Sequence, residues 1–250
     1  SRRTSSRPFG VTNSAERFGL QATFLTHTTD GTALDNLMSW PAGAILPLAP
    51  FLKLGGSDVR WVVVAFEIAA ILLLWLAAPR ELRPLSVLPL LVDPDLFLQF
   101  TGGGVMDFMW VAPMVGAAIA LYRRHFLWSA LLFGVAAGTK QQPWLLAPFL
   151  MLYVWNTDQH QSIRGRLRAC SSYGGAAAAS FLVLNGPFIA LDPAAWFEGT
   201  MLPFTRQLVP FGSGLSMLTQ TGIADLPKGF YSLATFGVWG LYWSPKMQTQ

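Results

Sequence analysis

A chain of 250 residues that is 52% hydrophobic and only 12% charged has too few charged side chains to cover the surface of a water-soluble fold. Ten Trp and 18 Phe, together with a mean hydropathy of +0.42, indicate that much of the outer surface faces lipid. The net charge is only +4, and the basic residues form short clusters between apolar runs. This pattern is typical of membrane topology signals and argues against nucleic acid as a partner.

The first third of the chain contains one clear membrane span. Residues 1–37 are polar and show no helical or alternating apolar period, which predicts a loop outside the hydrocarbon. The run from Met38 to Leu54 is apolar but contains three prolines and is short for a span of about 20 residues, so we expect an interfacial or re-entrant helix. Residues 60–79 are long enough to cross. Arg80 and Arg83 follow directly, and the positive-inside rule places that end in the cytoplasm.

Two pairs of shorter apolar runs follow, and the basic clusters set their direction. Residues 84–100 and 104–122 are expected to cross outward and back, because the next basic cluster begins at Arg123 and belongs on the cytoplasmic side. Residues 126–139 and 141–155 form a second pair of half-helices that returns to a loop rich in arginine.

The last part of the chain alternates between membrane and exterior. The 23 uncharged residues from Ala169 to Leu191 are expected to cross outward. Residues 192–229 contain Pro, Gly and Trp and are expected to form an external segment, and residues 230–250 begin a further membrane helix. The chain starts with Ser and its last apolar run is short, so we expect a piece of a longer protein.

These elements predict an all-α fold. We expect a polytopic transmembrane bundle of about six to eight segments, with short half-helix hairpins and external loops. Residues 1–250 would form a single membrane domain, in which residues 38–191 are the helical core. By the same count the arginine clusters lie on the cytoplasmic side, and most of the polar side chains that suit chemistry lie on the other.

Lys140 is the most informative residue, because an ammonium between two apolar runs is costly unless a polar partner or a water-filled cavity receives it. The helix expected before it rises only about 21 Å, less than the roughly 30 Å hydrocarbon core, so Lys140 should stop below the outer surface. Pro143 suits the first turn of the next half-helix, whose N-terminus would add positive potential. With Gln141 and Gln142 beside it, Lys140 predicts a phosphate site; the alternative is a lysine that snorkels to the interface.

Several carboxylates lie near the same side. Asp107 follows a run of three glycines, where it would pair with Lys140, bind sugar hydroxyls or cap the following helix. Asp93 and Asp95 lie inside a short crossing and need a partner or water, unless the helix breaks there near a vestibule. Glu67 lies in an otherwise apolar span, and we expect a structural role for it, either protonated or paired with a neighbouring helix.

The sequence offers no support for a metal or a cofactor. Cys170 is the single cysteine, which excludes a disulfide framework and a cysteine-based metal site. The three histidines are scattered between loops of opposite sidedness, and no glycine-rich nucleotide motif is present. We therefore predict neither metal nor cofactor.

Two stretches of this chain carry a resemblance to a known family. They are FTGGGVMDFMWVAPMVGAAIALYRRHFLWSALLFGVAAGTKQQPWLLAPFLMLYVW and NGPFIALDPAAWFEGTMLPF. Between about residues 38 and 230, the chain resembles bacterial GT-C-type membrane glycosyltransferases, particularly the polyprenyl-phosphate-mannose-dependent, mannosyltransferase-like group. The most specific piece is the segment from Gly134 to Pro143, coupled to Asp107 upstream.

The resemblance implies a hexosyltransferase with a sugar donor on a polyprenyl phosphate and an acceptor that is a glycan, a lipid or a protein. It also implies a multi-pass protein of the bacterial plasma membrane, which contacts membrane lipid and works on the extracytoplasmic side. In that superfamily an acidic residue of the first external loop deprotonates the acceptor hydroxyl, and the transfer inverts the anomeric centre. Lys140 and Asp107 match the family's lysine and the acidic residue at the head of the preceding helix pair.

The chain departs from the family pattern near its N-terminus. It lacks the first membrane helix and the acidic pair common in the first external loop. Asp30 and Asp35 are the only acidic residues near the right place, so the base is one of these two or lies outside this chain, which would then be inactive by itself. A secondary transporter or channel for an anionic or polar solute is the alternative, because half-helices that meet at a polar tip also form transport sites. A non-catalytic membrane scaffold is a further alternative.

Overall fold

The computed structural model describes most of the central part of the chain. It covers residues 26–27, 33–34, 39–91, 101–102, 106–157 and 162–205, and single positions or short pieces between 218 and 237. Residues 39–200 form one compact unit, which is described here by itself. The predicted all-α fold is confirmed. The described strands are two-residue pieces, β1 (Thr26–His27) paired antiparallel with β2 (Ala33–Leu34), within the segment expected to be a loop.

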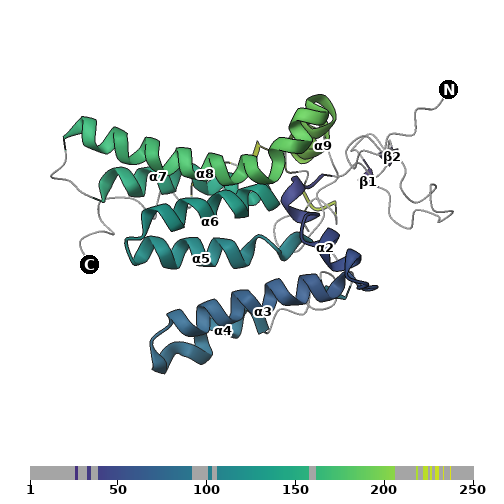
Figure 1. The fold of residues 1–250 in the computed structure, drawn as a ribbon, viewed down its shortest axis with the longest axis horizontal. Helices are drawn as coiled ribbons and strands as arrows, with labels where there is room; N and C mark the ends of the chain where they lie inside the picture. The colour runs from purple at the N-terminus through teal and green to yellow at the C-terminus, as the bar shows by residue number, and fades with distance from the viewer. Residues whose placement is uncertain are drawn as a thin grey trace. The chain divides into compact units, whose positions relative to one another are not determined.

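Two helices agree closely with the apolar runs 60–79 and 126–139, whereas only the first half of the expected crossing 84–100 lies within the described residues (Figure 1). In chain order they are η1 (Ala42–Ala44), α2 (Leu48–Lys53), α3 (Arg60–Ala77), η2 (Arg80–Leu82), α4 (Arg83–Leu91), η4 (Met106–Phe108), α5 (Val111–Tyr122), α6 (Phe126–Thr139), η5 (Gln142–Leu146), α7 (Ala147–Asn156), α8 (Ile163–Leu191) and α9 (Pro193–Thr205).

Two described helices, α3 and α8, are long and apolar enough to cross a membrane. Only 22% of the most apolar window of α3 and 11% of that of α8 are buried inside the protein. A core helix of a soluble protein would be buried on most of its surface, so these exposed apolar faces fit contact with lipid. Together with the shorter apolar helices between them, they make this an all-α membrane protein.

The chain differs from the sequence expectation at both ends of the last long helix. The arginine-rich stretch expected to be a loop forms the first turns of α8, which begins at Ile163 and is capped by Ser162, whose side chain accepts a hydrogen bond from the Gly165 amide. The expected external segment also begins as a helix, α9. There the Asp192 carboxylate accepts a hydrogen bond of 3.1 Å from the Ala195 amide.

The compact unit is arranged around α6. Figure 1 shows α5, α6 and α8 running side by side, and α7 packs along α8 while α3 packs against α5. A buried apolar cluster joins these elements. Its buried members are Ala117, Leu121, Ala130, Phe133, Val154, Tyr173 and Ala177. Three of the seven are alanines, which allow the helix backbones to come close together at these positions.

Two glycines let α6 touch α8 along its length. A Cβ atom at Gly134 would overlap the carbonyl oxygen of Ala177, and one at Gly138 would lie 3.0 Å from the Asn185 amide nitrogen. The glycines are four residues apart and therefore share one face of the helix. Small residues at this spacing are typical of tightly packed membrane helices. The Ser180 hydroxyl strengthens the contact by donating to the Leu131 carbonyl at 2.8 Å.

We predict that Gly134→Ala lowers the unfolding temperature of the detergent-solubilised protein. The added methyl group meets backbone atoms that no rotamer change moves, so α6 and α8 have to separate, at a cost of about 1–3 kcal/mol. Gly175→Ala is the matched control, because a Cβ there meets nothing within 4 Å. It should leave the unfolding temperature unchanged or raise it slightly through better helix propensity. Equal effects of the two substitutions would contradict tight packing at Gly134.

Candidate functional site

Lys140 lies where α6 ends. Its backbone is extended (φ −148°, ψ 158°), and its amide still donates to the Ala136 carbonyl, so the helix terminates and the chain turns at this residue. The side chain folds inward, with only 12% of its surface exposed. Its ammonium forms an ion pair and a hydrogen bond with the Asp107 carboxylate, 33 residues earlier in the chain. The structure therefore brings together two of the residues singled out from the sequence.

Trp40 completes this arrangement from a third part of the chain. Its indole N–H donates to Oδ1 of Asp107 at 2.5 Å, and its ring centroid lies 5.2 Å from the Lys140 Nζ atom. That distance is within the range of a cation–π interaction. We call Trp40, Asp107 and Lys140 the lysine cluster.

Asp107 does not cap α5. It belongs to the short helix η4, and α5 has Trp110 at its N-cap without a side-chain hydrogen bond. Of the three roles considered for this carboxylate, pairing with Lys140 is the one observed among the described residues.

Asn185 holds the Trp40 segment against the end of α6. Its Oδ1 accepts a hydrogen bond of 2.7 Å from the Ala42 amide, and its Nδ2 donates to the Gly138 carbonyl at 3.1 Å. The side chain is fully buried in α8. Gly43 lies beside it, where a Cβ would come within 2.5 Å of the Gly138 oxygen. Three segments distant in sequence therefore meet within one turn of Lys140.

The two glutamines after Lys140 differ in their surroundings. Gln141 is 4% exposed, and its amide nitrogen donates to the carbonyls of Ser39 and Thr200, the latter at 2.7 Å. Both of its N–H groups thus serve the fold. Gln142 is exposed and begins η5. Pro143 is buried at the start of that helix, as the sequence predicts.

The half-helix expected directly after Lys140 begins differently from the prediction. The chain first forms η5, a 3-10 helix of five residues, and α7 starts only at Ala147. An α-helix N-terminus therefore does not stand next to the ammonium. The positive potential at this point comes from Lys140 itself.

Burial and charge act in opposite directions on Lys140, which lies in the turn between two helices and outside α3 and α8. Burial removes most of the water around its ammonium, and the Asp107 carboxylate compensates for part of that loss. The cation is thus held in a poorly solvated position, where an additional anion would stabilise its charged form.

Of the other carboxylates singled out from the sequence, one lies within the described residues and four do not. Glu67 is 5% exposed in α3, and the Thr101 hydroxyl donates to it at 2.5 Å, which fits the structural, paired role expected. Asp30, Asp35, Asp93 and Asp95 lie outside the described residues.

Residues 39–247 match the model of glycosyltransferase family 87. The chain belongs to this family. The match includes the whole lysine cluster and agrees with the expected GT-C-type membrane glycosyltransferase. It decides for a glycosyltransferase over the transporter or channel considered from the sequence. No curated protein and no solved structure matches the chain.

Sequence reasoning missed Trp40, which belongs to the lysine cluster of this family 87 member, and Asn185, which holds the Trp40 segment in place. A signal for Asn185 was present, because it is a polar amide within an otherwise apolar span, and such a residue needs a partner. Trp40 had no comparable signal. Its contact with Asp107 joins residues 67 positions apart, which no local pattern encodes.

We predict that Asp107→Asn destabilises the protein by about 1–3 kcal/mol, because it leaves a largely buried ammonium without its counter-ion. Thermal unfolding in detergent measures this effect. Asp58→Asn is the matched control. It removes the partner of Arg60 from an ion pair in which both side chains are more exposed, and exposed pairs contribute little.

The double variant Asp107→Asn with Lys140→Met should recover part of the lost stability, since it removes the buried charge along with its partner. A double variant as unstable as the sum of the two single variants would show that the two side chains do not interact.

Proposed function

We propose that this family 87 glycosyltransferase transfers a hexose from a polyprenyl-phosphate donor to an acceptor hydroxyl on the extracytoplasmic side of the bacterial plasma membrane. The observation that carries the proposal is the ammonium of Lys140, held largely buried at the end of a membrane-protein helix. A cation kept in such a place is a functional candidate by default. The family assignment supplies the reaction class, and the cation favours a phosphate-linked donor.

Among the described residues, the Lys140 ammonium uses only part of its hydrogen-bonding capacity. A lysine carries three N–H groups, and within the described residues Lys140 uses one of them, to Asp107. The face of Trp40 covers another side. A phosphate oxygen can therefore join the cluster without displacing Asp107 completely. The carboxylate then remains close enough to accept from sugar hydroxyls, in line with the substrate-binding role predicted for Asp107. Of the two glutamines predicted to share that role, Gln142 is exposed, whereas the N–H groups of Gln141 are used within the fold.

The transfer is proposed to be a single displacement with inversion. The acceptor oxygen forms a bond to the anomeric carbon while the bond from that carbon to the phosphate oxygen breaks. A carboxylate takes the proton of the acceptor hydroxyl, and the polyprenyl phosphate leaves with the bonding electron pair. Lys140 would stabilise the charge that develops on this leaving group. Asp30 and Asp35 are our candidates for the base, and both lie outside the described residues.

The arrangement of charges along α6 supports the proposed sidedness. The turn before α6 contains Arg123 and Arg124, and Lys140 follows its other end after 14 helical residues, a rise of about 21 Å. The first turns of α8 bring a second set of arginines to the end that holds Arg124. Arginine clusters favour the cytoplasmic face, so the Lys140 end would face the exterior.

The donor site is tested by Lys140→Gln. We expect about tenfold weaker binding of a radiolabelled polyprenyl-phosphate mannose to the protein in nanodiscs, because one charge-assisted contact to phosphate is lost. Lys53→Gln is the control, since Lys53 is an exposed lysine at the end of α2. Unchanged affinity of the Lys140 variant, or an equal loss in both variants, would count against the phosphate role of Lys140.

The catalytic base is tested separately by Asp30→Asn and Asp35→Asn. If one of them takes the acceptor proton, its variant should lose transfer by about a hundredfold or more while it still binds the donor. Asp58→Asn, at an exposed ion pair, serves as the control for loss of a carboxylate. Full transfer activity in both variants would exclude the two residues as the base.

A further inference from the structure

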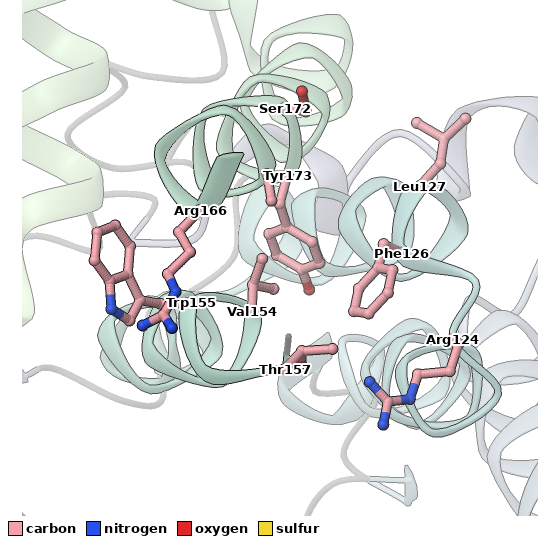
Figure 2. Close-up of a pocket in the computed structure, with 10 residues that line it drawn as sticks. Arg124, Phe126, Leu127, Val154, Trp155, Thr157, Arg166, Ser172 and Tyr173 are labelled. Carbon is pink, nitrogen blue, oxygen red and sulfur yellow. The ribbon is translucent and has the colours of Figure 1, made fainter. Parts of the chain in front are cut away.

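A second site lies at the other end of the helix bundle. The structure contains a pocket of about 550 Å³ lined by the turn before α6, the start of α6, the end of α7 and the first half of α8. Figure 2 shows its side chains, with Arg124 and Arg166 on opposite sides and the rings of Tyr173 and Phe126 between them. The full length of α6 separates this pocket from Lys140, so it is not part of the lysine cluster.

The charged side chains of the lining are cationic. The lining contains two guanidinium groups, of Arg124 and Arg166, and no carboxylate among the described residues. Arg166 lies over the ring of Trp155, with its Cζ atom 5.8 Å from the centroid. The N-terminus of α6 adds positive potential, because it has no side-chain cap and its first two residues line the pocket. An anion is the ligand that this lining favours.

Most of the rest of the lining is apolar. Phe126, Val154 and Trp155 belong to it, and so does Leu127, which is 62% exposed. Nearby on α8, Ile163 is 71% exposed. Exposed apolar side chains on a membrane helix face hydrocarbon. The ligand must therefore combine an anionic group with a hydrocarbon part.

We propose that this pocket binds an anionic phospholipid of the leaflet at the arginine-rich end of the bundle. Its phosphate would lie between Arg124 and Arg166, and the first part of an acyl chain would lie against the aromatic walls. Basic pockets between membrane helices suit lipid headgroups in this way, because arginine pairs with two phosphate oxygens at once. The site takes a structural or regulatory lipid, whereas the donor lipid is proposed for the Lys140 end.

The role of the two lining arginines is tested by comparison with two neighbouring arginines outside the lining. Native mass spectrometry of the full chain, released from detergent with added phosphatidylglycerol, reports how much lipid is retained. We expect Arg124→Gln with Arg166→Gln to retain about tenfold less than the wild type. Arg123→Gln with Arg168→Gln removes the same number of charges from the same turn and helix, outside the lining, and should retain lipid like the wild type. Equal losses in the two double variants would overturn the proposal, because they would show general charge attraction.

A second pair of variants fills the pocket without changing its charge. Ala169→Phe places a ring in the lining, one turn before Tyr173 on the same face of α8, and Ser171→Phe places the same ring nearby, at an exposed position outside the lining. Only Ala169→Phe should reduce retention of phosphatidylglycerol. Equal retention by the two variants would exclude the pocket as the lipid site.

Two further ligands test whether the pocket selects an anionic lipid rather than any lipid or free phosphate. Phosphatidylcholine, which has no net charge, should be retained several-fold less than phosphatidylglycerol by the wild type. Inorganic phosphate at millimolar concentration should not displace the bound lipid, because it lacks the acyl chain. Equal retention of both lipids, or displacement by phosphate alone, would show that the pocket does not select an anionic lipid.

Discussion

Close contact between the backbones of α6 and α8 positions everything else in this unit. Gly134 and Gly138 remove the side chains that would keep the helices apart, and Asn185 then reaches both the Gly138 carbonyl and the Ala42 amide. Without that approach, the fully buried Asn185 amide would lose its bonds to Ala42 and Gly138 and would keep only the Trp196 indole and the Phe181 carbonyl as partners, which is costly. The same contact fixes the segment that carries Trp40 over the end of α6, where Lys140 begins the turn.

The lysine cluster follows from the cost of a poorly solvated charge. A lysine at 12% exposure loses most of its hydration, and one carboxylate and one indole ring replace only part of it. If stability alone were selected, an apolar side chain of similar volume would serve at least as well. The arrangement is understandable when a further anion joins the cluster, since the site is then built before its ligand arrives and little reorganisation is needed.

The sequence predicted local structure well where charge and apolar character change abruptly. The limits of α6 agree with the apolar run from 126 to 139, because a basic turn precedes it and Lys140 follows. The start of α8 was missed, since its arginines resemble a loop by composition although Ser162 gives a capping signal. The helix α9 was missed despite a similar signal at Asp192. In both places hydropathy points to a loop, and only the capping side chain indicates a helix.

Contacts between distant segments were harder to predict, and they decide what the site is. Pairing of Asp107 with Lys140 was one of three roles considered, and only the packed fold selects it. The length of α6, which agrees in the sequence and in the fold, limits where its two ends can lie in a membrane. A rise of about 21 Å cannot bring both of its cationic ends to the surfaces of a roughly 30 Å hydrocarbon core. Arg124 is exposed and can extend to an interface, whereas Lys140 is turned inward. For a membrane-crossing α6, the Lys140 end therefore lies below the headgroups, where Asp107 and, in the function we propose, the phosphate of the donor take the place of water.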